Sequence, residues 1–181
     1  MSNTPLPAFY TQLPTQLVET AIESCITLLR ARLNFEIDAV FAAYRQPGVA
    51  ATRNVPHFSD SAFYTTEIIQ PFRVPACWVL PERTKFDLKA QNISLSEHQL
   101  MVILLTEDVE IQRMNKTVWN YAVAAYKCLH DKPFNNAYFF VEGVEYSAAY
   151  TRPAGGDSAE RNFQRDITLR VRAMLYEPTT F

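Results

Sequence analysis

The sequence has little glycine and no long apolar run. It contains 4 glycines, which excludes collagen-like and glycine-rich low-complexity chains. The longest apolar run covers residues 100–105, whereas a membrane-spanning helix needs roughly 20 apolar residues, so we expect no membrane partner. The chain begins Met-Ser-Asn-Thr-Pro, without the basic and apolar segments of a signal peptide. We therefore expect the protein to be assembled in the cytoplasm.

Cysteine and histidine are also scarce, at 3 residues each. Cys25, Cys77 and Cys128 are widely spaced in apolar surroundings, which is typical of buried free thiols in a reducing compartment. The one close Cys/His pair is Cys128 with His130, whereas a structural zinc site needs four ligands. We therefore expect no metal. We interpret His98 as a polar residue at a strand end and His130 as a charge at the end of a helix.

Motifs for catalysis or cofactor binding are missing as well. Gly155-Gly156 is followed by neither the Lys-Ser/Thr of a phosphate loop nor an apolar helix, so it is better explained as a flexible turn. The sequence contains no Gly-x-Ser-x-Gly and no local cysteine-nucleophile signature. Glu142 and Glu145 are three residues apart on an expected strand, so they should face opposite sides. We expect no cofactor and no enzymatic activity; a small cytoplasmic enzyme is the alternative from a different class.

Apolar and aromatic residues are plentiful. Hydrophobic residues make up 48% of the chain and charged residues 20%, which excludes a mostly disordered protein. With 181 residues the chain can form one domain with a substantial core. Much of the surface of the 12 phenylalanines and 9 tyrosines must be buried in that core or against a partner. The net charge of −2 is not that of a typical nucleic-acid binder.

The first half of the chain predicts an arm, a long helix and a loop. Residues 1–13 contain Pro5 and Pro7 and should form an extended arm. Apolar residues at helical spacing follow over 14–44, and Pro47-Gly48 should stop the helix. This pattern indicates one long helix or two helices separated near Asn34. The alternation around Phe35 also fits a strand, but the continuous i, i+4 spacing favours a helix. Residues 49–74 should form a long surface insertion that either contains a short strand around 63–69 or packs on a neighbour.

The middle of the chain predicts strands and a second helix. Residues 76–80 lie between Pro75 and Pro81, which indicates a brief strand, and 85–94 should form another. The clearest strand is 95–106, whose apolar side chains on both faces indicate a central position covered on both sides. Asp108 should cap a helix that runs to about His130. The expected buried stripe of that helix consists of Ile111, Met114, Val118, Ala122, Ala125, Tyr126 and Leu129, and Trp119 and Val123 widen it.

Two long strands are expected at the end of the chain, over 137–150 and 163–177. The connection 151–162 should be a mobile hairpin tip, and 178–181 a short tail. Residues 14–177 would then form a single α+β domain. The predicted fold is α+β: a mostly antiparallel sheet with a long N-terminal helix and a second helix packed on it, plus an extended β-hairpin arm.

One segment is basic. Between residues 152 and 172 there are five arginines and three acidic residues, a local balance of 5 − 3 = +2 in a chain of net charge −2. One interpretation is a solvated strand face. The other is a charged rim that meets an acidic partner or lines a channel for nucleic acid. The candidate residues at a subunit interface or a lumen are Tyr150, Arg152, Arg161, Phe163, Arg165, Arg170 and Arg172.

The order of these elements resembles that of the tail terminator (tail completion) proteins of long-tailed bacteriophages. A long helix (14–44) and an irregular aromatic-bearing segment precede the strand Pro-Ala-Cys-Trp-Val-Leu-Pro at 75–81. The apolar strand His-Gln-Leu-Met-Val-Ile-Leu-Leu-Thr-Glu-Asp (98–108) then leads into the helix expected at 109–130, and an alternating hairpin strand ends near 177. The resemblance covers roughly residues 14–177. The insertion 49–74 and the proline-rich arm depart from the family's pattern.

The resemblance implies a structural virion protein in the tail or neck. Such proteins form a homohexameric ring that caps the tail tube and receives the neck of the head. The implied partners are further copies of the chain, the tail tube protein and a neck or connector protein, with DNA passing through the lumen without sequence-specific binding. Another neck component, such as a head–tail joining or stopper protein, is the main alternative.

Overall fold

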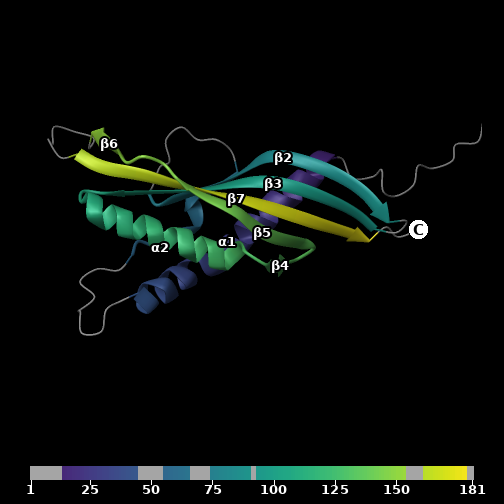
Figure 1. Cartoon of the computed structure of the whole chain (residues 1–181), viewed down its shortest axis with the longest axis horizontal. Helices are drawn as coiled ribbons and strands as arrows, with labels where there is room; N and C mark the ends of the chain where they lie inside the picture. The colour runs from purple at the N-terminus through teal and green to yellow at the C-terminus, as the bar shows by residue number, and fades with distance from the viewer. Residues whose placement is uncertain (1–13, 45–54, 66–73, 91–92, 154–160, 179–181) are drawn as a thin grey trace, which may run out of the picture.

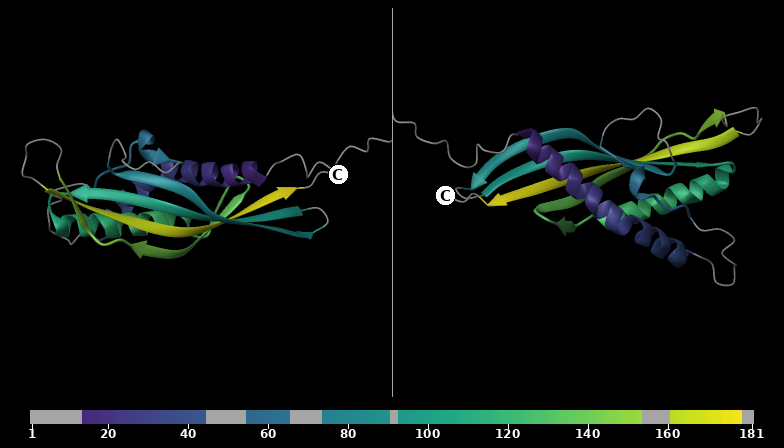
Figure 2. Two further views of the ribbon diagram at one scale, coloured as in Figure 1. Left: turned by 90° about the horizontal axis from the view of Figure 1, so that it is seen from above. Right: turned by 180° about the vertical axis from the view of Figure 1, so that it is seen from behind.

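The computed structural model describes residues 14–44, 55–65, 74–90, 93–153 and 161–178, and it has an α+β fold. Helices α1 (Pro14–Tyr44) and α2 (Ile111–Leu129) pack on one face of a seven-stranded sheet (Figure 1). Figure 2 shows α1 crossing in front of the strands when the molecule is seen from behind, with α2 alongside. The predicted fold class is confirmed.

The strands are β1 (Phe63–Tyr64), β2 (Ala76–Ala90), β3 (Ile93–Asp108), β4 (Lys132–Phe134), β5 (Ala137–Tyr146), β6 (Tyr150–Pro153) and β7 (Arg161–Pro178). Their order in the sheet is β1-β2-β3-β7-β5-β4, and β6 pairs with β7. All pairs are antiparallel except β1 with β2. A short 3-10 helix (Asp60–Ala62) precedes β1. Strand β1 confirms the short strand expected in the long insertion.

Helix α1 is continuous through Asn34, which excludes both the two-helix and the strand interpretations. Its i, i+4 thread of Ala21, Cys25, Leu29 and Leu33 is fully buried. Phe35, on which a strand would depend, is 70% exposed. The helical period therefore overrides the local alternation because four turns of continuous burial outweigh three residues of period two.

The predicted break at Pro81 is wrong, because β2 runs on through it. The pairing register shifts between Pro81 and Arg83, and residues on either side continue to pair with β3. On its other side β2 pairs with β1 only at Cys77 and Trp78. Pro81 therefore lies on an edge strand, where its missing N–H removes no hydrogen bond from a central ladder.

The main core lies between the helices and one face of the sheet. Leu100, Val102 and Leu104 of β3 are completely buried on this face. Their partners on β7 include Leu169 and Val171, so the predicted alternation of the last strand is confirmed. The meeting of the two helices with the central strand therefore forms the core, as expected.

The opposite face of the sheet carries no described helix and a smaller apolar cluster. Trp78 and Leu105 are buried there, and Trp78 stacks on Tyr64 with 5.6 Å between ring centroids. Met101 and Ile103 are only partly buried. The expected cover on both faces of β3 therefore holds for Leu105 and only in part for its neighbours.

Helix α2 differs from its predicted form at its start and in its buried stripe. Strand β3 extends to Asp108, and the N-cap is Glu110. Asp108 instead accepts a hydrogen bond from the Glu110 N–H at 3.0 Å. Trp119 was expected to be buried but is 57% exposed, and Tyr121 is fully buried instead. Ile111 and Tyr126 are also exposed, so the buried stripe is rotated toward Val118, Tyr121 and Ala125.

The last predicted strands are longer and more divided than expected. The strand predicted at 137–150 is split into β5 and β6, and residues 150–153 pair with 161–164 instead of forming a connection. Pro178 still belongs to β7. The predicted arm (1–13), residues 45–54 and 66–73, the tip at 154–160 and the tail at 179–181 lie outside the described residues. Neither described helix is both long and apolar enough to cross a membrane.

Candidate functional site

The part of the chain that the structure describes has no group of three metal-ligating side chains. Cys25, Cys77 and Cys128 are buried free thiols, as expected. Burial raises the pKa of the Cys128 thiol to about 12, and it raises the pKa of Cys25 and Cys77 above the ordinary value. Because the thiolate is the reactive form, these cysteines are poor nucleophiles at neutral pH.

His98 is a buried core residue, so its assignment to a strand end was wrong. It lies within β3 and is completely buried. Its Nδ1 is 3.1 Å from Thr84 Oγ1, and its Nε2 is 2.9 Å from Ser96 Oγ. Burial lowers the pKa of His98 below its ordinary value. A neutral imidazole held by two hydroxyls serves to satisfy polar groups in the core.

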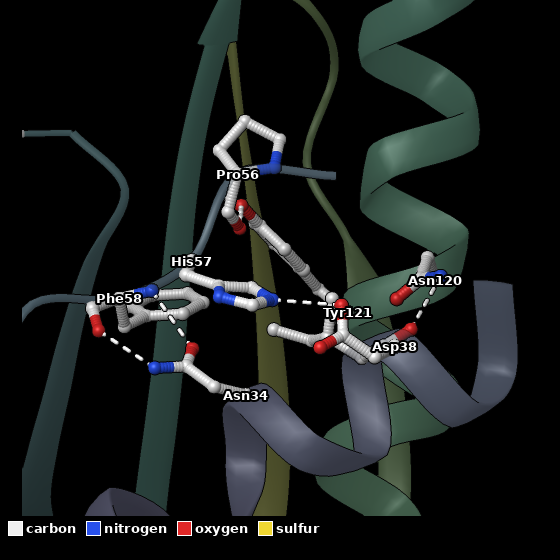
Figure 3. Close-up of polar contacts among 8 residues, drawn as sticks. Asn34, Asp38, Pro56, His57, Phe58, Asn120 and Tyr121 are labelled. Carbon is white, nitrogen blue, oxygen red and sulfur yellow. Dashed lines mark hydrogen bonds and ion pairs between the residues drawn. The ribbon is translucent and has the colours of Figure 1, made fainter. Parts of the chain in front are cut away.

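A polar cluster holds the segment 55–65 against the two helices (Figure 3). Asn34 of α1 donates from Nδ2 to the Phe58 carbonyl, and the Phe58 N–H donates to Asn34 Oδ1, each at 2.9 Å. Tyr121 of α2 donates its hydroxyl to the Pro56 carbonyl at 2.6 Å. These three bonds satisfy backbone groups that have no strand partner, so this cluster positions the chain that leads into β1.

Two further contacts lie beside this cluster. His57 Nε2 is 2.8 Å from Asp38 Oδ1, and both side chains are largely exposed. Asn120 Nδ2 donates to the Ile37 carbonyl at 3.2 Å, which ties α2 to α1 (Figure 3). An exposed pair such as His57 with Asp38 contributes only about 0–1 kcal/mol. These contacts are those of a structural anchor.

The helix-free face of the sheet carries a ladder of paired charges. Arg172 Nε lies 3.1 Å from Glu142 Oε1, and Arg170 Nη2 lies 3.1 Å from Glu145 Oε1. The expectation that Glu142 and Glu145 face opposite sides was wrong, because the register of β5 shifts just after Val141. Such a bulge adds one residue to the strand and returns the second carboxylate to the same face.

The apolar cluster adjoins these charges directly. Met101 on β3 is the cross-strand partner of Arg170, and Gln99 is the partner of Arg172. The Arg172 guanidinium also lies over the Phe140 ring, 5.4 Å from its centroid. The helix-free face therefore combines apolar area with charges of both signs.

The structure separates the other candidate residues. Arg165 lies on the helix side, where its Nε donates to the Ser147 carbonyl and its Nη1 to Asn115 Oδ1, both at 2.8 Å. Phe163 is partly buried against the main core, and Tyr150 is exposed on β6. In the β6–β7 ladder residue 152 pairs with residue 162, and residue 161 pairs with residue 153. The side chains of Arg152 and Arg161 are outside the description.

The two ends of α2 have different surfaces, acidic residues before its start and basic residues at its end, as the sequence indicated. The turn before the helix exposes Val109, Glu110 and Ile111. Glu110 lies 3.6 Å from Arg113, which mainly binds Asp108. Burial raises the pKa of Asp108, but hydrogen bonds from Arg113 and the Glu110 N–H lower it below its ordinary value. The lowered pKa keeps Asp108 ionised at neutral pH, and the exposed Glu110 side chain lies beside it.

The other end of α2 forms an open hollow of about 380 Å³, lined by Arg32, Glu36, Tyr126, Lys127, His130 and Lys132. His130 is the C-cap of α2, which agrees with its expected place. Its ring stacks on Tyr126 at 4.5 Å, and its Nδ1 is buried with no hydrogen-bond partner among the described residues. The clustered Lys127, His130 and Lys132 were visible in the sequence, but the contribution of Arg32 depends on the packing of α1.

No protein-family model and no curated protein matches the sequence. Among solved structures, the chain is similar to one in an assembly described as "Virion of native gene transfer agent (GTA) particle". The two share 16% identity with a TM-score of 0.40, over 82% of this chain and 95% of the other. At that TM-score the two chains agree only loosely in three dimensions, and the similarity assigns no function.

Proposed function

We propose that this protein is a structural component of a phage-like particle, a tail terminator whose copies form a ring of six at the end of the tail tube. The observation that carries the proposal is the helix-free sheet face. There the apolar cluster around Met101 directly adjoins Arg170, a paired but half-exposed arginine. An apolar centre bordered by a polar, charged rim is the arrangement of surfaces that bind other proteins.

The exposed apolar side chains support an assembly role. Trp119 and Tyr126 protrude from α2, and Val109 and Ile111 protrude from the turn before it. Tryptophan and tyrosine are enriched among the residues that carry binding energy at protein interfaces. By contrast, the described histidines are occupied in packing or structural contacts. These features favour contacts with proteins over catalysis.

The resemblance noted in the sequence supplies the specific role. A terminator ring would cap the tail tube, receive the neck and let DNA pass through its lumen. We propose that Arg170 and Arg172 face that lumen or a neighbouring subunit, together with Tyr150, Arg152 and Arg161. Phe163 packs against the main core, which favours a supporting role for it at this end of the hairpin. The contacts of Arg165 with Ser147 and Asn115 favour a positioning role for this residue at the β6–β7 end.

Particles made without the protein test this proposal. A terminator limits tube growth, so its loss should give tails of uncontrolled length that carry no heads, and the wild-type protein should lie at the head-proximal end of the tail. Normal tail length with unjoined heads would favour a head–tail joining or stopper protein instead. Absence of the protein from purified wild-type particles would contradict the proposal.

The β6–β7 hairpin provides a second test. Replacing residues 154–160 by a two-residue turn leaves the paired residues 150–153 and 161–164 intact. If this tip contacts a neighbouring subunit, the variant should fold normally but form fewer complete rings and fewer head-joined tails. Full rings with normal tails would show that the tip is not an assembly element.

A further inference from the structure

We propose that the two ends of α2 are the two halves of one subunit contact: Glu110 of one copy enters the hollow formed by Arg32, Lys127 and Lys132 of the next copy. This inference rests on the proposed self-assembly, and it identifies the contact that would build the ring. The partner is therefore a second copy of this chain.

The acidic half is a small protruding turn. Val109 is 58% exposed and Ile111 is 42% exposed, one on each side of Glu110. The Glu110 carboxylate is also largely exposed, and its one described ion pair, with Arg113, is long at 3.6 Å. Two uncovered apolar side chains beside a weakly paired carboxylate can supply both buried area and a directing charge.

The basic half has more positive charge than the chain itself neutralises. Arg32, Lys127 and Lys132 face the hollow with one carboxylate, Glu36, which gives a formal charge of 3 − 1 = +2. Glu36 is buried and is bound by Arg32 at 3.1 Å. Among the described residues, Lys127 and Lys132 form no ion pair. A carboxylate from outside would balance these two ammonium groups, and the exposed Tyr126 ring offers apolar area beside them.

The two halves cannot meet within one molecule. Seventeen residues separate Glu110 from Lys127 along α2, which corresponds to about 26 Å at 1.5 Å per residue. Two complementary surfaces at opposite ends of α2 can form a heterologous contact between copies, and such contacts close into rings when the rotation between copies allows it. The charge asymmetry of α2 therefore favours head-to-tail assembly.

Zero-length cross-linking tests the contact directly. A carbodiimide joins a carboxylate to an amine only when the two touch, so the oligomer should give an amide bond between Glu110 and Lys127 or Lys132. A mixture of ¹⁵N-labelled and unlabelled protein, mixed before assembly, would show by mass spectrometry that the bond joins two copies. Absence of this bond from an oligomer in which other Glu–Lys pairs are cross-linked would overturn the inference.

Charge reversal gives an independent test. Glu110→Lys and the double variant Lys127→Glu/Lys132→Glu should each raise the apparent dissociation constant of the oligomer by about tenfold or more, since like charges then face each other. Combining all three substitutions should restore assembly to near the wild-type level. Glu19→Lys is the matched control for Glu110→Lys, because Glu19 is exposed on α1, about 20 Å along the helix from Arg32 at 1.5 Å per residue, and it should change nothing.

The outcomes separate the inference from the proposed function. If both reversal variants form the same ring as the wild type, the inference is overturned, whereas the proposed ring is not. A Glu110–Lys127 cross-link in a species no larger than a dimer supports the contact and contradicts the ring. Tight binding of inorganic phosphate by the hollow, with unchanged assembly in Lys127→Glu/Lys132→Glu, would make it an anion site and overturn the subunit contact.

Discussion

The two faces of the sheet differ in how their side chains are used. On the helix-covered face, Leu100, Val102 and Leu104 are completely buried against α1 and α2. On the helix-free face, alternate residues of the same strand adjoin Arg170 and Arg172, which are paired with carboxylates and remain partly exposed. One face therefore holds the fold together, and the other is available for contacts. Substitutions on neighbouring residues can separate these two roles.

The largest difference is expected between Val102→Asp and Ile103→Asp, which point to opposite faces of β3. Val102→Asp puts a carboxylate with no partner into the core and should cost at least about 4 kcal/mol, enough to abolish cooperative unfolding. Ile103 is only partly buried, so Ile103→Asp should leave a folded protein. Thermal unfolding followed by circular dichroism measures both. Equal melting temperatures would contradict the assignment of the core to the helix side.

The next effect concerns the anchor that holds 55–65 on the helix side. Asn34→Ala removes two hydrogen bonds and leaves the N–H and carbonyl of Phe58 without these partners, which should cost about 2–3 kcal/mol. Tyr121→Phe removes one bond and keeps the ring contact with Phe58, so it should cost about 1 kcal/mol. Urea unfolding gives both values. A larger loss for Tyr121→Phe would contradict this order.

A smaller effect is expected from the titration of His98 within the same face. Burial lowers the pKa of His98 in the folded protein, whereas the unfolded chain binds a proton near the ordinary value of about 6.5. The contribution of neutral His98 is therefore fully present above pH 6.5 and is lost as the pH falls, by at most about 1.4 kcal/mol per pH unit. His98→Gln should show a shallower decline in unfolding free energy between about pH 7 and 5.

His57→Gln is the control for this titration, because His57 is exposed and its pair with Asp38 lies at the surface. Its pH dependence should follow that of the wild type more closely than His98→Gln does. A wild-type slope retained in His98→Gln would show that another group is responsible.

The smallest effect should come from the helix-free face. Arg170→Gln and Arg172→Gln each remove a partly exposed ion pair, worth about 0–1 kcal/mol of unfolding free energy. If this face serves contacts, the same variants should nevertheless reduce assembly. A loss of stability as large as that of Asn34→Ala would show that the charge ladder belongs to the fold.

The helix-covered face was predictable because its signals are local. The i, i+4 spacing of Ala21, Cys25 and Leu29 and the alternation of β7 each depend on residues close in sequence. The prediction of helix, and not strand, over 14–44 and of the buried side of the last strand therefore succeeded. Tyr121 was missed because an amphipathic stripe alone does not fix the rotation of a helix within one residue's width.

The surface features depend on strand register and on contacts between elements that are distant in sequence. The bulge after Val141, which brings Glu142 and Glu145 to one face, did not follow from the period-two alternation of the strand. The hollow at the end of α2 needs Arg32, which lies on another helix. Pro81 suggested a strand end, but a strand can continue through proline when it lies at an edge of the sheet, and the sequence does not show which strands lie there. Longer-range packing decides each of these cases.

The mass of the wild-type protein in solution tests the central claim of self-assembly most directly. Native mass spectrometry, together with sedimentation velocity over a dilution series, should reveal a species of six copies, six times 20.7 kDa or about 124 kDa. Because a closed ring cannot grow further, no larger oligomers should form at high concentration. A 20.7 kDa monomer at every concentration would contradict the claim.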